Sequence, residues 1–285
     1  MAEKFGRIYK LTIEKDDGSA VVIEPPLTLQ FNVQRNSMAS INSATFQIFN
    51  LSEDVRNEIF QDRFSFLKYK KVILEAGYDD LSVVFVGSIF EANSASVGTE
   101  IVTTIYARDG GFDTVTAKTF RTVQKGVTIK DLVKGLIADF PNVTEGAVGD
   151  VEGTLTRPAA LDGNTFYLLR TYTGEQVFID LEKVNVLKNS EVLTGQVPLL
   201  SPQTGLLETP KREDAYLTIT TLFEPRVIMS QFVELKSEVL PQYNGQYKVI
   251  GVNHQGVISG AIGGQCQSTF GLLIEGQLFG GFSVV

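Results

Sequence analysis

The amino-acid sequence predicts a mainly β protein with a small α+β insertion. Residues 1–118 and 200–285 contain runs in which apolar and polar side chains alternate, as half-buried strands require. Between them, residues 119–199 contain helical spacing followed by a short hairpin pattern. We therefore expect an N-terminal antiparallel β-barrel with one short helix, a small α+β domain, and a C-terminal antiparallel β-barrel with a tail. A chain of 285 residues is long enough for three domains that each bury a core.

The first hundred residues show the most regular alternation. In Leu27–Gln34 every second side chain is apolar, so one face of an extended strand is hydrophobic. The same pattern predicts strands at Ile8–Ile13, Ala44–Ile48, Lys71–Ala76, Val83–Phe90 and Ile101–Ala107. Asp17-Gly18 suits a tight hairpin turn, because glycine accepts a positive φ without steric cost. These strands are expected to form an antiparallel sheet that closes into a barrel or a sandwich.

Two helices are predicted from caps and spacing. Ser52 is a candidate N-cap, and Val55 and Ile59 fall on one face of the short helix that follows, which is expected to cover the first barrel. Apolar residues recur at three- and four-residue steps over Thr128–Phe140, and Pro141 ends the pattern.

A third helix is predicted at Asn164–Tyr172, with Gly174 placed for a left-handed C-terminal turn. Gln176–Asp180 and Val184–Leu187 follow as a hairpin. Between Thr194 and Pro210 the share of proline, glycine, serine and threonine rises, which is typical of a linker or a long surface loop.

The second β segment runs from Ala215 to about Phe270. Thr220–Phe223 is expected to be a strand that Glu224-Pro225 breaks, and Phe232–Leu235 a second strand. Asn244-Gly245 is a candidate turn before a strand at Tyr247–Val252. These elements predict a compact antiparallel barrel.

Composition restricts the possible functions. The formal net charge of −8 argues against a nucleic-acid reader, since phosphate binding requires clustered lysine and arginine. No apolar run approaches the roughly 20 residues that span a bilayer. The start of the sequence lacks the layout of a secretory signal, and one cysteine excludes an intramolecular disulfide. We expect a soluble protein made in a reducing cytoplasm.

The search for chemistry assigns no catalytic, cofactor-binding or metal residue. His254 and Cys266 lie on separate predicted strands, and a lone cysteine is more often a small buried hydrophobe than a nucleophile. A serine triad would also need His254, yet the sequence has no Gly-x-Ser-x-Gly elbow. A spatial pair of glycosidase carboxylates stays open, because sequence does not reveal such pairing.

Acidic and glycine-rich segments are interpreted as turns. Asp16-Asp17 and Asp79-Asp80 lack the spaced oxygen ligands of a calcium loop. Asp109-Gly110-Gly111-Phe112-Asp113 lacks the lysine and hydroxyl residue of a phosphate loop, so a turn is favoured over a ligand site.

A series of motifs in a fixed order stands out. The C-terminal third contains TTLFEPRVIMSQFVELKS at 220–237 and NGQYKVIGVNHQG at 244–256. Shorter motifs precede them: Phe5-Gly6-Arg7, Pro26–Phe31, Ser43–Phe46, Phe49–Ser52 before an acidic helix, and Gly205–Pro210. In this order the chain resembles the hub proteins at the centre of the baseplates of contractile-tailed phages, and the similarity covers most of its length.

The resemblance implies a structural role without catalysis or cofactors. It implies two tail-tube-like β-barrels per subunit, so that a homotrimer forms a pseudo-sixfold ring. Such a ring joins a sixfold tail tube to a threefold spike or tail tip and surrounds a channel for DNA, which is only passing cargo. The implied partners are the tube protein, the spike or tail-tip protein, other baseplate subunits and the tape measure protein. The implied location is the virion baseplate, assembled in the host cytoplasm without membrane insertion. The acidic balance fits a non-adhesive channel wall, or only solubility.

The C-terminal residues 278–285 contain phenylalanines separated by glycines. They are interpreted either as the last strand of their own barrel or as a segment that docks on the sheet edge of a neighbouring subunit. Rival classes also stay open: a tail-associated cell-wall hydrolase, a β-sandwich binding module, and another tail component such as a distal tail or tube protein. The absence of tryptophan weakens a saccharide-binding interpretation, and a tube subunit would normally have one barrel.

Overall fold

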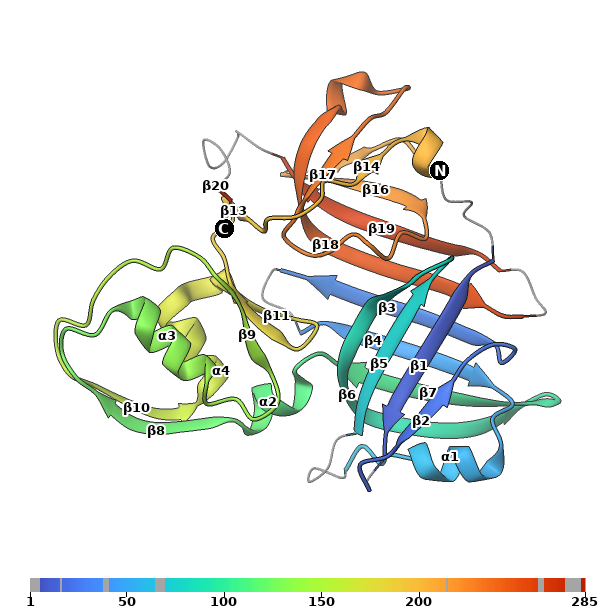
Figure 1. Ribbon diagram of the computed structural model, residues 1–285, viewed down its shortest axis with the longest axis horizontal. Helices are drawn as coiled ribbons and strands as arrows, with labels where there is room; N and C mark the ends of the chain where they lie inside the picture. Colours follow the sequence, from blue (N-terminus) through green and yellow to red (C-terminus); the bar gives the residue numbers. More distant parts are fainter. Residues whose placement is uncertain are drawn as a thin grey trace.

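The computed structural model describes residues 6–15, 17–37, 41–64, 70–213, 215–260, 264–274 and 283–284. Two β regions lie next to each other, and a smaller helix-containing domain lies beside them (Figure 1). Strands dominate and most of them pair antiparallel. The predicted fold class, mainly β with a small α+β insertion, is confirmed.

The first β region contains seven strands, all paired antiparallel: β1 (Ile8–Glu14), β2 (Ala20–Ile23), β3 (Leu29–Asn36), β4 (Ser43–Phe49), β5 (Lys70–Gly77), β6 (Leu81–Val97) and β7 (Glu100–Arg108). Each strand predicted here is present, and β6 is longer than expected. The Asp17-Gly18 turn joins β1 to β2, with Gly18 at φ 82°. In Figure 1, β1 and β5 pass in front of β3 and β4, so the sheet curls around a core.

Helix α1 (Glu53–Ile59) begins where the sequence predicts. The Ser52 hydroxyl accepts the backbone N–H of Val55, and Ile59 is buried in the core of the first β region. The expected lid over this region is therefore present.

Three helices lie in or next to the middle domain: α2 (Gly111–Thr116) just before it, and α3 (Ile129–Ile137) and α4 (Thr165–Thr173) within it. Its strands are β8 (Lys118–Val123), β9 (Thr144–Val148), β10 (Ala159–Asn164), β11 (Val177–Asp180) and β12 (Lys183–Val186), and a 3-10 turn spans Gly174–Gln176. β8 pairs with β10, while β12 pairs antiparallel with β11 and parallel with β9. Thr128 and Asn164, the first residues of the two predicted helices, are N-caps whose side chains accept backbone N–H groups, and Gly174 has φ 67°.

Two features of the middle domain differ from expectation. The Asp109–Asp113 segment turns the chain, as predicted, but it also opens the short helix α2, with Gly110 at φ 58°. Helix α3 ends at Ile137 rather than Phe140, because the residues before Pro141 leave the helical conformation. Phe140 still packs in the core of this domain.

The C-terminal part contains the short strands β13 (Glu191–Val192), β14 (Leu199–Leu200), β15 (Lys211–Glu213), β17 (Phe232–Leu235) and β20 (Ser283–Val284), and the longer strands β16 (Tyr216–Leu222), β18 (Gly245–Ile258) and β19 (Cys266–Leu273). Two 3-10 turns span Pro202–Thr204 and Pro241–Tyr243. The segment expected to be a linker or surface loop is packed in part, because β14 pairs parallel with β17. Of the C-terminal tail, Ser283–Val284 pair parallel with β13 of the same chain, and residues 278–282 and 285 lie outside the described part.

The two β regions share one sheet. β18 pairs antiparallel with β3 over eight residue pairs, from Gly251–Asn36 to Ile258–Leu29. The resulting order is β15-β16-β19-β18-β3-β4-β7-β6-β5-β1-β2. The cores also cross the boundary, since Phe223 and Cys266 pack in the first core. This shared sheet fixes the two β regions side by side.

Candidate functional site: a buried junction between domains

The tip of the β11–β12 hairpin contacts the first β region through buried polar side chains. Four residues form this junction cluster: Arg35 and Asn42 from the first β region, Asp109 from the segment after β7, and Asp180 at the end of β11. All four side chains are buried. The cluster therefore joins segments more than 130 residues apart in the sequence.

Arg35 is the centre of the junction cluster. Its guanidinium donates to both carboxylate oxygens of Asp180, with Nε–Oδ1 and Nη2–Oδ2 distances of 2.8 Å each. Nη1 also donates to the carbonyl oxygen of Val84 at 3.1 Å. A planar guanidinium matches a carboxylate in this bidentate geometry, and the side chain of Arg35 is 0% exposed.

Asn42 and Asp109 satisfy the backbone of the hairpin. The Asn42 amide donates to the Ile179 carbonyl oxygen at 2.8 Å and to Oδ1 of Asp180 at 3.1 Å. The Asp109 carboxylate accepts the backbone N–H groups of Leu181 and Glu182 at 2.6 Å and 2.8 Å.

The turn between β11 and β12 explains why an acceptor is needed there. Leu181 and Glu182 both have positive φ, 53° and 57°, as in a tight two-residue hairpin turn. Their N–H groups point out of the turn and are satisfied by Asp109. Burial and the adjacent Asp180 carboxylate raise the pKa of Asp109 to about 7, although the two N–H groups and Arg35 act in the opposite direction.

A charged pair lies at the rim of the junction cluster. Lys71 Nζ and Glu182 Oε2 are 2.5 Å apart; the Lys71 side chain is partly exposed, whereas Glu182 is buried. A groove of about 420 Å³ runs beside this pair between β5, β6 and the middle domain, with Val83, Val86 and Asn142 in its lining.

A second buried contact fixes the middle domain to the C-terminal region. Lys248 on β18 donates from Nζ to the carbonyl oxygens of Lys188 and Asn189 at 3.0 Å and 3.3 Å. Burial lowers the pKa of Lys248 to about 8. The Glu191 carboxylate accepts the N–H groups of Lys188 and Asp150, both at 2.7 Å. Both β regions therefore contact the middle domain through buried polar groups.

The two residues considered as nucleophile and base are structural. β18 and β19 are neighbours, but their register pairs His254 with Ser268 and Cys266 with Gly256. Cys266 packs in the first core, and burial raises its thiol pKa to about 11, so the thiolate is disfavoured.

His254 is 0% exposed and forms a 2.7 Å hydrogen bond between Nδ1 and the Ser268 hydroxyl. Burial lowers its pKa to about 3, so the ring is neutral. The same hydroxyl accepts the backbone N–H of Glu224 at 2.9 Å, and the rings of Phe223 and Phe270 pack edge-on against the imidazole. A fully buried serine and histidine cannot meet a substrate, so this pair organises the core.

The acidic segments behave as turns and anchors. Asp17 accepts the backbone N–H of Ser19, and Asp79-Asp80 lie in the bend between β5 and β6; Asp16 lies outside the described residues. Asp113 is buried and accepts the backbone N–H groups of Asn142 and Val143. In the part of the chain that the structure describes, no three histidine, cysteine, aspartate or glutamate residues gather as a metal site.

Sequence reasoning missed the junction cluster, although one signal was available. Arg35 continues the inward row of β3 after Leu29, Phe31 and Val33, so a charged residue occupies a core position. Such an exception to the alternation indicates a buried partner of opposite charge. None of the helices in the described segments is both long and apolar enough to cross a membrane.

The fold is two connected β regions and a helix-containing domain joined by buried polar contacts, and solved structures with a similar fold are known. The chain is similar to a tail protein from Neisseria meningitidis MC58, with TM-score 0.59, 11% identity, and coverage of 95% of this chain and 98% of that one. It is also similar to the 43 kDa tail protein of prophage MuSo2 from Shewanella oneidensis, with TM-score 0.60, 8% identity, and coverage of 93% and 96%.

A third similar structure is the E. coli c3393 protein, with TM-score 0.61, 8% identity, and coverage of 90% of this chain and 76% of that one. That protein is described as a component of the type VI secretion system with structural similarity to the T4 bacteriophage tail proteins gp27 and gp5. A search of curated proteins found no match. At these identities the likeness shows the fold. Residues 8–256 match the family described as baseplate hub gp41, and the chain belongs to this family of phage tail structural proteins.

Proposed function

We propose that this chain is the subunit of a homotrimeric hub ring that joins a sixfold tail tube to a threefold spike or tail tip. Three copies with two β regions each supply six β regions around one axis. The observation that carries the proposal is the β3–β18 pairing, because it holds the two regions of one chain side by side in a single sheet. DNA passes through the centre of the ring as cargo.

The domain division follows the three hydrophobic cores. We propose an N-terminal barrel at 1–118, a small α+β domain at 119–199, and a C-terminal barrel with its tail at 200–285. Three separate clusters of buried side chains support this division, one for each proposed domain with a few residues crossing. The junction cluster would keep the middle domain in a fixed orientation while the ring transmits force.

The proposed partners are the tube protein, the spike or tail-tip protein, other baseplate subunits and the tape measure protein, in a virion baseplate assembled in the host cytoplasm. The chain acts by assembling and not by catalysis. The full burial of His254 and Ser268 supports this part of the proposal. Cell-wall turnover by the purified protein would contradict it and favour a tail-associated hydrolase.

The test of the ring is the native mass of the full-length protein over a range of concentrations, with negative-stain images of the same sample. We expect a three-copy species with an open centre. A monomer at every concentration, with and without a spike partner, would overturn the ring and favour a binding module or another tail component.

A further inference from the structure

Five neighbouring strands of the shared sheet, β16, β19, β18, β3 and β4, present no charged side chain on the face opposite the core. On β3 and β4, the side chains opposite the core are Gln30, Asn32, Gln34, Ser43, Thr45 and Gln47. The pattern continues into the C-terminal region, where β18 and β19 present Asn253, Gln255, Gln267 and Thr269. β16 adds Thr218 and Thr220, which lie between the exposed apolar side chains of Tyr216 and Leu222. We call this surface the neutral face; all of its strands lie within the described residues.

The neutral face is continuous across both β regions. Cross-strand pairing places Gln267, Gln255, Asn32 and Thr45 in one row, and Thr220, Thr269, Asn253, Gln34 and Ser43 in a second row. Neighbouring strands lie about 4.8 Å apart, so five strands span roughly 20 Å. The face is therefore a wide surface and not a local cluster.

The lack of charge is unusual for a surface of this protein. Charged residues make up 20% of the chain and are mostly exposed in proteins, so a solvent-facing surface of five strands would ordinarily include several of them. Charges return at the borders of these strands: Glu100 and Arg108 stand at the ends of the outward row of β7, and Lys211 and Glu213 of β15 pair with Thr218 and Tyr216. The remaining outward positions of β18, Gly251 and Val257, are also uncharged.

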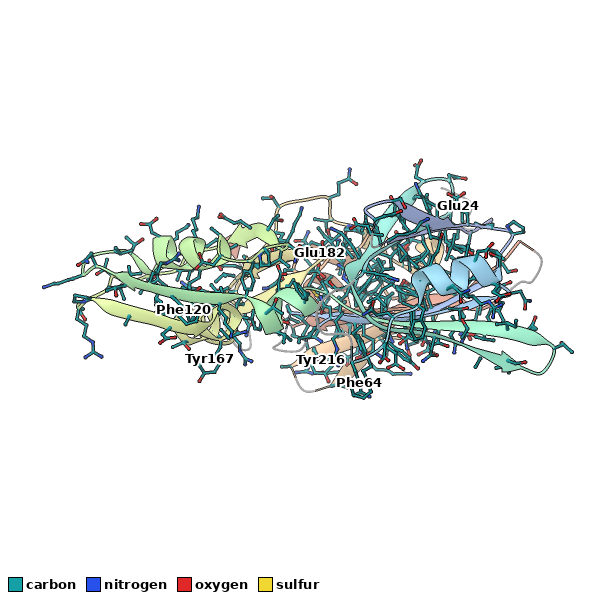
Figure 2. The ribbon with its side chains drawn as sticks, turned by 90° about the horizontal axis from the view of Figure 1, so that it is seen from below. Glu24, Phe64, Phe120, Tyr167, Glu182 and Tyr216 are labelled. Atoms are coloured by element: carbon teal, nitrogen blue, oxygen red, sulfur yellow. The ribbon has the colours of Figure 1, made fainter. Side chains whose placement is uncertain are left out.

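The neutral face also differs from a protein interface. Interface cores are enriched in aromatic residues, methionine and arginine, whereas amides and hydroxyls dominate this face. Tyr216 begins the outward row of Thr218 and Thr220, and Figure 2 shows it on the opposite side of the molecule from Glu24 and Glu182. The face thus points away from the side that carries the Lys71–Glu182 pair.

We infer that the neutral face lines the DNA channel of the hub ring, an inference that rests on the proposed function. Lysine or arginine on a channel wall would hold a polyanion by releasing its counterions. Amide and hydroxyl groups stay hydrated and carry no net charge, so the wall neither retains nor strongly repels DNA. The channel is then non-adhesive because its wall is neutral, and the net charge of −8 belongs to other surfaces.

Thiol labelling of assembled rings tests the position of the face. Asn32→Cys reports on the neutral face, Thr269→Cys repeats the test on β19, and Gln124→Cys is the matched exposed control on the middle domain. The native thiol, Cys266, is buried, so wild type gives the background. Each ring is treated with N-ethylmaleimide or with a maleimide on a polyethylene glycol chain too bulky to enter the ring.

We expect both face variants to react with the small reagent and to show only background labelling with the bulky one, while the control reacts with both. Labelling by neither reagent in the ring would make the face a subunit interface, and labelling by both would place it outside. Either outcome overturns the inference and leaves the ring intact. A protein that forms no ring with any partner overturns both the inference and the proposed function.

Charge insertion tests the chemistry of the wall. Rings of Asn32→Lys/Gln255→Lys should retain duplex DNA at low salt and release it steeply as salt rises, because the paired positions place two cations in one row. Wild-type rings and the neutral pair Asn32→Gln/Gln255→Asn should not retain DNA. Retention by wild type equal to that of the lysine variant would contradict a non-adhesive wall.

Discussion

Arg35 on β3 and Asp180 on β11 form a bidentate ion pair with both N–O distances at 2.8 Å, although 145 residues separate them in the sequence. The Arg35 side chain is 0% exposed and that of Asp180 is 10% exposed. This pair connects the sheet shared by both β regions to the middle domain, which makes the chain one mechanical unit.

Removing one partner of this pair should be costly. Arg35→Met leaves the Asp180 carboxylate buried without its cation, which typically costs about 3–5 kcal/mol of unfolding free energy. Arg35→Lys should also destabilise, because an ammonium cannot reproduce the bidentate geometry. Equilibrium denaturation with urea measures the unfolding free energy of both variants. The double variant Arg35→Met/Asp180→Leu should cost less than Arg35→Met alone.

An exposed ion pair in the same chain provides the control. Lys134 and Glu145 are 3.3 Å apart, with side chains 47% and 44% exposed. Lys134→Met should change stability by less than about 1 kcal/mol, since solvent screens such pairs. Equal effects of Arg35→Met and Lys134→Met would refute the role given to the junction cluster.

Two glycines on β18 should respond oppositely to alanine. A Cβ on Gly256 would lie 2.6 Å from the Cα of Cys266 on β19, so Gly256→Ala must shift one strand and should cost about 1–3 kcal/mol. A Cβ on Gly251 would meet Gly271 at an ordinary 3.9 Å, and Gly251→Ala should be neutral or stabilising by up to about 1 kcal/mol. Thermal unfolding of both variants compares them directly. A larger loss of stability for Gly251→Ala than for Gly256→Ala would contradict the register of β18 and β19.

The β11–β12 turn should be stabilised by a residue that tolerates positive φ. Leu181 has φ 53°, a conformation that costs an L-residue about 1–2 kcal/mol. Leu181→Gly should therefore raise the unfolding free energy, whereas Leu181→Ala retains a Cβ and should not. If alanine stabilised the protein as much as glycine, the strain would lie elsewhere.

The buried His254 should make the protein sensitive to acid. Its folded pKa of about 3 lies below the ordinary value of 6.5, so both states are neutral above pH 6.5. Between pH 6.5 and 3, only the unfolded state takes up the proton, and stability falls as pH falls, by at most about 1.4 kcal/mol per pH unit. His254→Asn should remove this part of the slope in urea unfolding. An unchanged slope would show that His254 is accessible to protons when folded.

Asp109 should change the stability of the protein with pH in the opposite direction to His254. Its folded pKa of about 7 lies above the ordinary 3.8, so the folded state holds the proton more tightly between these values. Its contribution to stability is present below about pH 4 and is lost as pH rises to about 7. Asp109→Asn should cost about 1–3 kcal/mol, because an amide cannot accept both turn N–H groups, and should remove the rising-pH loss. If Asp109→Asn lost stability between pH 4 and pH 7 as the wild type does, the raised pKa would not belong to Asp109.

The local structure was predictable because it depends on neighbouring residues. The alternation over Leu27–Gln34 predicts β3, and the helices predicted to start at Ser52, Thr128 and Asn164 begin next to these residues, which cap them. The hairpin of β11 and β12 was also predicted from its strands. Its turn type was not, since Leu181 and Glu182 are not residues that favour positive φ.

The long-range structure was not predictable from one sequence. The β3–β18 ladder joins Leu29 to Ile258, and no local signal encodes which strands meet at such a separation. The same is true of Asp109, which looked like a turn residue and proved to accept the N–H groups of Leu181 and Glu182. The neutral face also needed the structure, because its two halves lie at opposite ends of the chain.

The most direct test of the hub assignment is a cryo-electron microscopy reconstruction of the assembled protein without imposed symmetry. We predict a threefold ring with six β lobes of similar size around an open centre, in which each pair of lobes is bridged by one β3–β18 ladder. A closed dimer, or a threefold particle with a filled centre, would contradict the account.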